Sequence, residues 1–320
     1  MKCVVYFQGV KEAHFLTKRL ASDFKNLQFA YPKDKRQLLK EIEDAEVLFG
    51  GFVDEETIDK AKKLRWFHCA AAGVDYIIKT MREHPHILFT SSKGVSEEQI
   101  SEWVIAMTLY TLKHVKQLQR LYDSKKLVNL VEPLMQDELF GKTVCIVGLG
   151  RIGKRAAQKF NALGCRVLGI KREKAEFPYI EKVGTLEDLK DFFSESDIIS
   201  THLALTEKTK GCINREAINS MKENALFINT ARGALVDEKA LIERLNRREI
   251  RALLDVIQDE PIKEGNPLLS TTNLLVTPHV SYNSKEFYGK LFDLFSANLK
   301  LYLQGRKDSL INVVNLRLGY

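Results

Sequence analysis

The stretch TVCIVGLGRIG, Thr143–Gly153, decides the fold of this chain of 320 residues. Its first five residues are apolar or β-branched, which is typical of a strand buried on both faces of a parallel sheet. Gly148, Gly150 and Gly153 follow in the spacing GxGxxG. Apolar side chains then recur at helical intervals until Gly164, a residue type that ends helices. The pattern predicts a strand, a glycine turn and a helix.

This glycine turn predicts the binding of a dinucleotide. Without side chains, the backbone can approach a pyrophosphate, and the exposed amides at the helix N-terminus can hold its charge. The motif places Gly148, Gly150, Arg151, Ile152 and Gly153 at such a site. A GxGxxG alone would also fit a structural tight turn, but the strand before it and the amphipathic helix after it favour the dinucleotide.

The next strand, predicted over Cys165–Ile170, indicates which dinucleotide is bound. An acidic residue about 20 residues beyond the glycine motif usually hydrogen-bonds to the ribose hydroxyls of NAD. Here Lys171 and Arg172 stand at the strand end, followed by Glu173. Two cations suit the 2′-phosphate of NADP, so NADP(H) is the expected cofactor, with NAD(H) as the alternative if Glu173 takes the acidic role. The two cations would also fit a merely solvated strand end.

The composition bounds the class of protein. A chain of 320 residues exceeds what one hydrophobic core usually supports, so two domains are expected. The formal net charge of +7 is spread along the chain, and we expect no nucleic-acid partner. The five cysteines contain no CxxC pair, which predicts no metal site and favours a reducing compartment. Without a recognisable signal peptide or membrane-spanning stretch, we expect a cytoplasmic protein with no membrane partner.

Strand and helix patterns alternate along the chain, which predicts parallel sheets with helices on both faces. A long amphipathic helix, predicted over Glu97–Leu121, precedes the glycine motif. A last helix, predicted over Lys285–Leu303, is expected to return to the first domain. We therefore predict one domain of residues 1–97 and 285–320, with a dinucleotide-binding domain of residues 98–284 inserted into it. The chain would then pass twice between the two domains, and these two connections would form a hinge with a cleft.

Three strands of the second domain end in side chains that can carry chemistry, at the sheet edge where ligands bind. ALFINT ends before Arg232, RALLDV before Glu260, and LLVTP before His279. Arg232 could bind a carboxylate in a planar fork and polarise a ketone. His279 could donate a proton to the carbonyl oxygen, and Glu260 could orient the imidazole and favour its charged form. Singly, each residue would also fit a surface or loop role, but together they predict reduction of a 2-oxo acid.

With their flanks, these residues resemble the D-isomer-specific 2-hydroxyacid dehydrogenase family, including its glyoxylate and hydroxypyruvate reductases, over nearly the whole chain. The segments that carry the resemblance are AAGVDYI (Ala71–Ile77), SEW (Ser101–Trp103), GKTVCIVGLGRIGK (Gly141–Lys154), SDIISTHLALTEKTKG (Ser196–Gly211), MKENALFINTARGALVDEKALIERL (Met221–Leu245), LDVIQDEP (Leu254–Pro261) and TPHV (Thr277–Val280). The resemblance implies an α/β fold in which a Rossmann dinucleotide-binding domain is inserted into a flavodoxin-like α/β substrate domain.

The resemblance also implies roles for individual residues. Arg232, Glu260 and His279 correspond to the family's catalytic triad, and amides near Ala72 and Gly73 would hold the substrate carboxylate together with Arg232. Further cofactor contacts are implied for Thr201, His202, Leu203, Thr230, Ala231 and Asp255. A homodimer through about residues 120–140 is implied as well. The implied activity is the NAD(P)H-dependent, preferably NADPH-dependent, reduction of a small 2-oxo acid to the D-2-hydroxy acid.

Two departures from the family pattern concern the substrate pocket and its surroundings. Ala204 stands where the HxPLT motif has proline, and Tyr282 and Asn283 stand where a small, glycine-containing run is usual. The substrate therefore stays open between glyoxylate or hydroxypyruvate and bulkier branched or aromatic oxo acids. Some proteins that resemble this family act as dinucleotide-sensing transcriptional co-regulators with little turnover. The intact triad argues against this alternative function.

Overall fold

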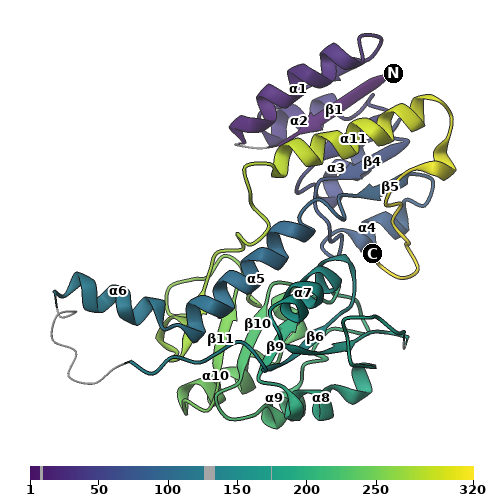
Figure 1. The fold of residues 1–320 in the computed structure, drawn as a ribbon. Helices are drawn as coiled ribbons and strands as arrows, with labels where there is room; N and C mark the ends of the chain where they lie inside the picture. The colour runs from purple at the N-terminus through teal and green to yellow at the C-terminus, as the bar shows by residue number, and fades with distance from the viewer. Residues whose placement is uncertain (8–9, 126–133, 174) are drawn as a thin grey trace. The chain divides into compact units, whose positions relative to one another are not determined.

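The computed structural model describes residues 1–7, 10–125, 134–173 and 175–320, with the backbone alone for residues 11–15. The chain divides into two compact units, each described by itself below (Figure 1). Unit 1 contains Met1–Ser96 and Ser284–Tyr320, and unit 2 contains Glu97–Asn283. The chain passes from one unit to the other after residues 96 and 283. Each of these boundaries is one residue earlier than the predicted boundary, after residue 97 or 284.

Unit 1 is built on a five-stranded sheet in which every neighbouring pair is parallel, in the order β2-β1-β3-β4-β5. The strands are β1 Lys2–Tyr6, β2 Gln28–Ala30, β3 Val47–Gly50, β4 Trp66–Cys69 and β5 Leu88–Ser91. This order is that of flavodoxin-like sheets, so the predicted fold of this unit is confirmed. The three-residue strand β2 was not predicted from the sequence.

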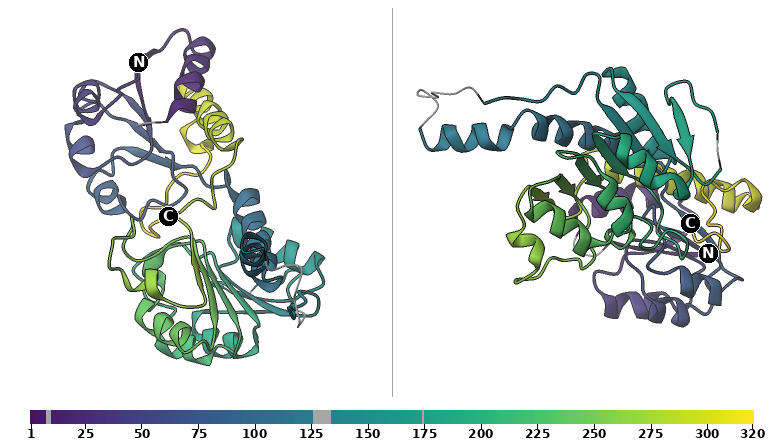
Figure 2. Two further views of the ribbon diagram at one scale, coloured as in Figure 1. Left: turned by 90° about the vertical axis from the view of Figure 1, so that its left-hand side faces the viewer. Right: turned by 90° about the horizontal axis from the view of Figure 1, so that it is seen from below.

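Helices cover both faces of the unit 1 sheet. The helices are α1 Lys11–Asp23, α2 Lys35–Glu41, α3 Glu55–Lys60, α4 Ile78–Glu83, α11 Phe287–Leu303 and the short η5 Lys307–Ser309. One core lies under α2, α3 and α4, and the other lies under α1 and α11, which run side by side (Figure 2). In the second core the ring of Phe295 stacks on Phe49 and on Trp66, with centroids 4.1 and 5.3 Å apart. The C-terminal helix thus shares a core with the first strands of the chain.

Unit 2 is built on a seven-stranded parallel sheet in the order β12-β11-β10-β9-β6-β7-β8. The strands are β6 Thr143–Val147, β7 Arg166–Ile170, β8 Lys182–Gly184, β9 Ile198–Thr201, β10 Leu226–Asn229, β11 Arg251–Leu254 and β12 Leu274–Val276. Successive strands run outward from β6 on one side and then restart at β9 on the other. This reversal is the switch point of a Rossmann sheet, beside which ligands bind.

Helices cover both faces of this sheet, and one further helix extends away from it. The helices are α5 Glu97–Leu112, α6 Val115–Asp123, α7 Arg151–Ala162, α8 Leu189–Glu195, α9 Arg215–Ser220, α10 Glu238–Asn246, η2 Leu186–Asp188, η3 Gly233–Leu235 and η4 Pro267–Ser270. α5 and α7 pack on one face, and α8, α9 and α10 pack on the other. No helix in the described ranges is long and apolar enough to cross a membrane.

The single helix predicted over Glu97–Leu121 is wrong, because the structure breaks it into α5 and α6. His114 has a φ of +52°, a left-handed conformation that a helix cannot pass through. Leu112, just before the break, is buried in the unit 2 core, whereas α6 has no fully buried residue and extends away from the rest of the unit (Figures 1 and 2). Part of the predicted dimer segment, residues 126–133, lies outside the described residues.

The glycine turn between β6 and α7 packs closely against its neighbours. Gly148 has a φ of +105°, and a Cβ added there would lie 2.8 Å from the carbonyl carbon of His202. A Cβ on Gly153 would lie 2.0 Å from the carbonyl oxygen of Gly148. A Cβ on Gly150, in contrast, would meet no atom of the described chain within 4 Å. The fold requires the first and third glycines, whereas the middle glycine faces open space.

Candidate active site

The turn after β6 presents the N-terminus of a helix. Its amides at Gly148 and Leu149 donate to the carbonyl oxygen of Ile170 at 2.9 and 3.2 Å, which fixes the turn on the end of β7. Helix α7 then begins at Arg151, with Gly150 as its N-cap and no capping side chain among the described residues. Its first amides can therefore bind an anion. Together with the open space beside Gly150, this arrangement fits a dinucleotide pyrophosphate.

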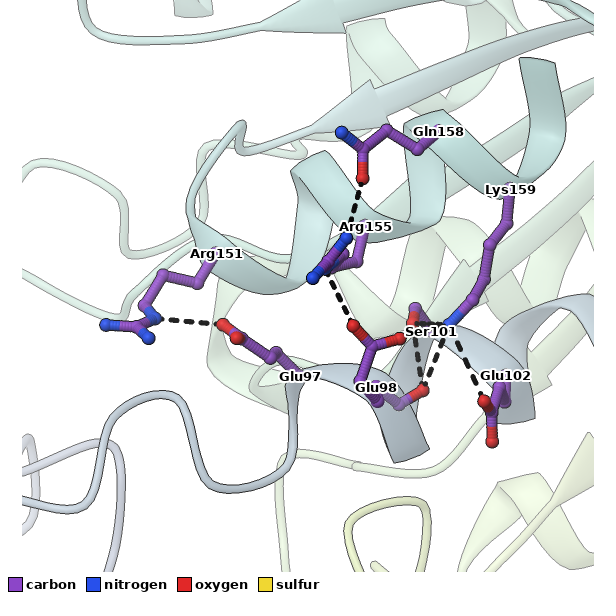
Figure 3. Close-up of polar contacts among 8 residues, drawn as sticks. All are labelled: Glu97, Glu98, Ser101, Glu102, Arg151, Arg155, Gln158 and Lys159. Carbon is purple, nitrogen blue, oxygen red and sulfur yellow. Dashed lines mark hydrogen bonds and ion pairs between the residues drawn. The ribbon is translucent and has the colours of Figure 1, made fainter. Parts of the chain in front are cut away.

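Ion pairs connect α7 with α5 (Figure 3). Arg151 Nε lies 2.8 Å from Glu97 Oε2, and Arg155 Nε lies 2.7 Å from Glu98 Oε1. Lys159 Nζ lies 2.9 Å from the other oxygen of Glu98. Surface ion pairs add little stability, but they direct the side chain of Arg151 toward α5. Its backbone amide, in contrast, belongs to the helix N-terminus.

Lys171 and Arg172 follow β7 directly and lie next to the glycine turn. The preceding residue, Ile170, is the one whose carbonyl oxygen accepts both amides of the turn. The amide of Lys171 donates to Gly184 at 2.9 Å, which ties this position to β8. The side chain of Lys171 is partly exposed, and those of Arg172 and Glu173 are exposed. The structure thus places two cations and one carboxylate at this strand end.

The end of β9 borders the glycine turn from the other side of β6. The peptide bond between His202 and Leu203 is the group that a Cβ on Gly148 would strike. Thr201 is fully buried, and its hydroxyl has no hydrogen-bond partner within the described residues. An orphaned buried hydroxyl beside a dinucleotide-type turn also fits a bound ligand, since such groups normally have partners.

His202 is neutral in this position. Its Nε2 lies 2.9 Å from Ser200 Oγ, and its Nδ1 lies 3.3 Å from Thr230 Oγ1. Burial lowers the pKa of His202 to about 4, because a charged ring would lose its hydration. The ring therefore joins the ends of β9 and β10 through neutral hydrogen bonds.

The turn after β10 is closed by Asn229, which the sequence analysis did not single out. Its Oδ1 accepts the amide of Ala231 at 3.0 Å, and its Nδ2 donates to the carbonyl oxygen of Arg232 at 2.9 Å. The guanidinium of Arg232 donates to the carbonyl oxygen of Ala231 at 2.8 Å. An asparagine at the end of a buried strand often closes such a turn, and that is the signal that could have identified it.

Gly233 brings the Arg232 turn against the segment that carries Glu260. A Cβ on Gly233 would lie 2.0 Å from the carbonyl carbon of Ile257. The amide of Ile257 in turn donates to Glu260 Oε1 at 3.1 Å, and Glu260 Oε2 lies 2.8 Å from His279 Nδ1. The structure thus gathers Arg232, Glu260 and His279 at one edge of the sheet.

The loop of His279 is held by the buried carboxylate of Asp255. His279 has a φ of +53°, a left-handed conformation that costs a non-glycine residue about 1–3 kcal/mol. Asp255 Oδ1 accepts the hydroxyl of Thr277 at 2.6 Å and the amide of Val280 at 2.9 Å, and Oδ2 accepts the amide of Ser281 at 2.9 Å. Asp255 is 1 % exposed, so these bonds are shielded from water. They fix the histidine in an otherwise unfavourable conformation.

Tyr282, one departure from the family pattern, lies next to His279, and Ala204, the other, lies in the turn after β9. The ring of Tyr282 packs edge-on against His279, with centroids 5.9 Å apart. The carbonyl oxygen of Ala204 accepts the hydroxyl of Thr209 at 2.7 Å, which closes the turn without a proline. Within the described ranges, no group of three or more histidine, cysteine or acidic side chains could hold a metal ion.

Ala72 and Gly73 lie in the loop after β4. Ala72 is exposed and Gly73 is partly exposed. They belong to unit 1, whereas every other predicted site residue belongs to unit 2.

The strand order and the glycine turn at the switch point of the sheet are those of the class of dinucleotide-binding Rossmann proteins. The family profile described as "D-isomer specific 2-hydroxyacid dehydrogenase, NAD binding domain" matches residues 105–281. The chain belongs to the D-isomer-specific 2-hydroxyacid dehydrogenase family, as the sequence predicted, and its cofactor is a nicotinamide dinucleotide.

Several relatives support this assignment. D-3-phosphoglycerate dehydrogenase of Methanocaldococcus jannaschii is 34% identical over 296 residues, which are 88% of this chain and 54% of the relative. Glyoxylate reductase of Korarchaeum cryptofilum is 31% identical over 298 residues, which are 89% of each chain. The structure of D-lactate dehydrogenase from Aquifex aeolicus with NAD and lactic acid has a TM-score of 0.84 and 26% identity, over 98% of each chain. The chain thus spans about half the length of the first relative and most of the other two.

We expect Asp255→Asn to loosen the His279 loop. In this variant an NH₂ group replaces one of the two carboxylate oxygens of Asp255. An NH₂ group cannot accept the hydrogen bond that this oxygen accepted, so one of the three buried hydrogen bonds is lost. The free energy of unfolding should fall by about 2–4 kcal/mol, and the amides of Val280 and Ser281 should exchange faster with solvent. Denaturation and hydrogen exchange measure the two effects.

Asp259→Asn is the matched control, because it makes the same change at an exposed position four residues on. It should leave both quantities unchanged. Equal behaviour of the two variants would show that Asp255 does not hold the loop.

Proposed function

We propose that this protein reduces a small 2-oxo acid to the D-2-hydroxy acid, with NADPH as the preferred reductant. The observation that carries the proposal is the contact of His279 Nδ1 with Glu260 Oε2 at 2.8 Å, beside the turn that presents Arg232. These groups supply a proton donor, its orienting carboxylate and a carboxylate-binding cation. Relatives named hydroxypyruvate reductase and glyoxylate reductase support the same substrate class.

A nicotinamide dinucleotide held at the glycine turn would supply the hydride for the carbonyl carbon of the substrate. Arg232 binds the substrate carboxylate through its planar guanidinium and polarises the carbonyl group. Because Nδ1 of His279 faces Glu260, Nε2 is the ring nitrogen that donates a proton to the carbonyl oxygen. The carbonyl becomes a hydroxyl group, and His279 regains its proton from solvent.

We assign the cofactor contacts to unit 2. The amides at Gly150, Arg151 and Ile152 hold the pyrophosphate, with Gly148 and Gly153 shaping the turn. The nicotinamide end is bordered by Thr201, His202, Leu203, Thr230, Ala231 and Asp255. The carboxylate of Asp255 already accepts three hydrogen bonds, so it acts mainly by fixing the loop of His279.

The preference for NADPH rests on Lys171 and Arg172. Both follow the strand whose end is fixed to the glycine turn, which is where a Rossmann sheet holds the adenosine ribose. Two cations there attract the 2′-phosphate that distinguishes NADP from NAD. In unit 1, the amides of Ala72 and Gly73 are proposed to bind the substrate carboxylate.

We further propose that the protein is a homodimer through the segment of about residues 120–140 and works in the cytoplasm. Val115, Leu118 and Tyr122 lie three or four residues apart on α6, and Val115 and Tyr122 are 39 % and 66 % exposed. Among the described residues no core covers this apolar stripe, which suits a partner subunit. The five cysteines are all free thiols, which suits a reducing compartment.

Replacing Arg232 tests the reaction directly. Arg232→Ala should lower kcat/KM for the 2-oxo acid on the order of 1,000-fold, because it removes both carboxylate binding and carbonyl polarisation. Arg232→Lys keeps the charge but loses the planar fork, so it should recover only part of this loss. The Kd for NADPH, measured by fluorescence titration, should change less than twofold in both variants. A near-normal rate in Arg232→Ala would remove this residue from the mechanism.

Replacing the two cations after β7 tests the cofactor preference. The double variant Lys171→Ala, Arg172→Ala should raise the Kd for NADPH roughly 100-fold, because two charge-assisted contacts to a phosphate are lost. The Kd for NADH should stay within about threefold. A control with the same charge change, Lys239→Ala with Arg247→Ala, alters two exposed cations of unit 2 and should affect neither cofactor. Equal losses for NADPH and NADH would refute the proposed phosphate site.

A further inference from the structure

A chain of buried polar side chains connects β4 with β5 in unit 1. Trp66 Nε1 lies 2.9 Å from Thr90 Oγ1, which lies 2.6 Å from His68 Nδ1. His68 Nε2 lies 3.2 Å from Ser92 Oγ, and Ser92 Oγ lies 2.9 Å from the carbonyl oxygen of Cys69. Ser92 is 2 % exposed, and the other four residues are fully buried. Polar groups buried in this way are costly unless every one has a partner.

The two ends of this chain fix the direction of its hydrogen bonds. The indole N–H of Trp66 can only donate, so Thr90 accepts it and gives its own proton to His68 Nδ1. The carbonyl oxygen of Cys69 can only accept, so Ser92 donates to it and accepts the Nε2–H of His68. Each group donates one proton along the chain, and the ring of His68 is neutral. Burial lowers the pKa of His68 to about 3, so this arrangement persists at neutral pH.

His68 has aromatic as well as polar neighbours. Its ring packs beside the stacked rings of Phe49 and Phe295, with centroids 5.3 and 5.6 Å away. A histidine in such an aromatic core contributes less hydrophobic stabilisation than a leucine or phenylalanine would. We therefore attribute the histidine at this position to its hydrogen bonds with the hydroxyl groups of Thr90 and Ser92.

The last hydrogen bond of this series lies at the loop after β4, which we propose to bind the substrate carboxylate. Cys69 is the last residue of β4, and its carbonyl oxygen accepts the hydroxyl of Ser92. The amide of Ser92 donates to the carbonyl oxygen of Ala71 at 3.1 Å. Ser92 thus holds the loop at two carbonyl groups, two residues apart, immediately before Ala72 and Gly73.

We propose that His68 and Ser92 are positioning residues for substrate binding, which fix the loop so that the amides of Ala72 and Gly73 bind the substrate carboxylate. Neither residue touches the substrate. Backbone amides bind an anion well only when their directions are fixed in advance, and Ser92 fixes the chain that carries them. His68 in turn fixes the hydroxyl of Ser92. The inference rests on the proposed function and extends it to the core of unit 1.

Ser92→Ala removes the hydroxyl that holds Cys69, and Ser91→Ala is its matched control. Ser91 is the preceding residue and is fully buried, but its hydroxyl has no partner within the described residues. We expect Ser92→Ala to raise KM for the 2-oxo acid that the wild type reduces fastest roughly tenfold, with kcat within twofold, because carboxylate binding is lost equally in ground and transition states. The Kd for NADPH should not change. Ser91→Ala should match the wild type.

A second pair of variants tests the link through His68. Thr90→Val keeps the shape of the side chain but removes the hydroxyl that donates to His68, whereas Thr90→Ser keeps the hydroxyl. We expect the valine variant to raise KM as Ser92→Ala does, and the serine variant to restore it. A network that only stabilises the fold would lower the melting temperature in Thr90→Val and Ser92→Ala but leave KM unchanged well below that temperature.

Hydrogen exchange at the amides of Ala70 and of residue 92, which donate to the carbonyl oxygens of Gly50 and Ala71 at 2.7 and 3.1 Å, provides a readout of the loop that needs no activity. Faster exchange in Ser92→Ala than in Ser91→Ala is expected, and equal exchange or an unchanged KM overturns the inference. If no 2-oxo acid is reduced by the wild type while exchange in Ser92→Ala is faster, the proposed function fails and the positioning of the loop stands.

Discussion

The close approach of the glycine turn to its neighbours is the constraint on which unit 2 depends. Gly153 lies so near the carbonyl oxygen of Gly148, and Gly148 so near the peptide bond after His202, that a methyl group fits at neither position. This packing brings the start of α7 and the end of β9 together at the point where the strand order reverses. The same contacts leave Gly150 facing open space. One turn thus provides both the close packing that the fold requires and the free space that a pyrophosphate would occupy.

A second constraint is the fixing, by buried polar side chains, of the loops that carry the predicted site residues. Asp255 holds the loop of His279 through three hydrogen bonds, and Asn229 closes the turn of Arg232 through two. Unit 1 repeats the principle, because Ser92 holds the loop before Ala72. In each case a buried side chain at or just beyond a strand end hydrogen-bonds to the backbone beside it, which restricts the conformations of that backbone.

The sequence predicted the parts whose signal is local. The buried strand and glycine spacing identified the Rossmann sheet, and the ordered motifs identified the family. The strands β2 (QFA) and β8 (KVG) contain too few apolar residues for a pattern, unlike the equally short β12 (LLV). The break at His114 was missed because apolar residues recur across it. The roles of Asn229 and Ser92 were missed for a different reason. Each depends on a partner that only the folded chain brings within hydrogen-bond distance.

The central claim is the hydride transfer itself, and the most direct measurement is to follow oxidation of NADPH and NADH by the wild-type protein. Glyoxylate, hydroxypyruvate, pyruvate, branched oxo acids and phenylpyruvate would be offered in turn, and the handedness of each product would be determined by chiral chromatography. The account predicts turnover with at least one acid, faster with NADPH, and a product of D configuration wherever it is chiral. Tight binding of NADPH without turnover of any acid, or a product of L configuration, would contradict it.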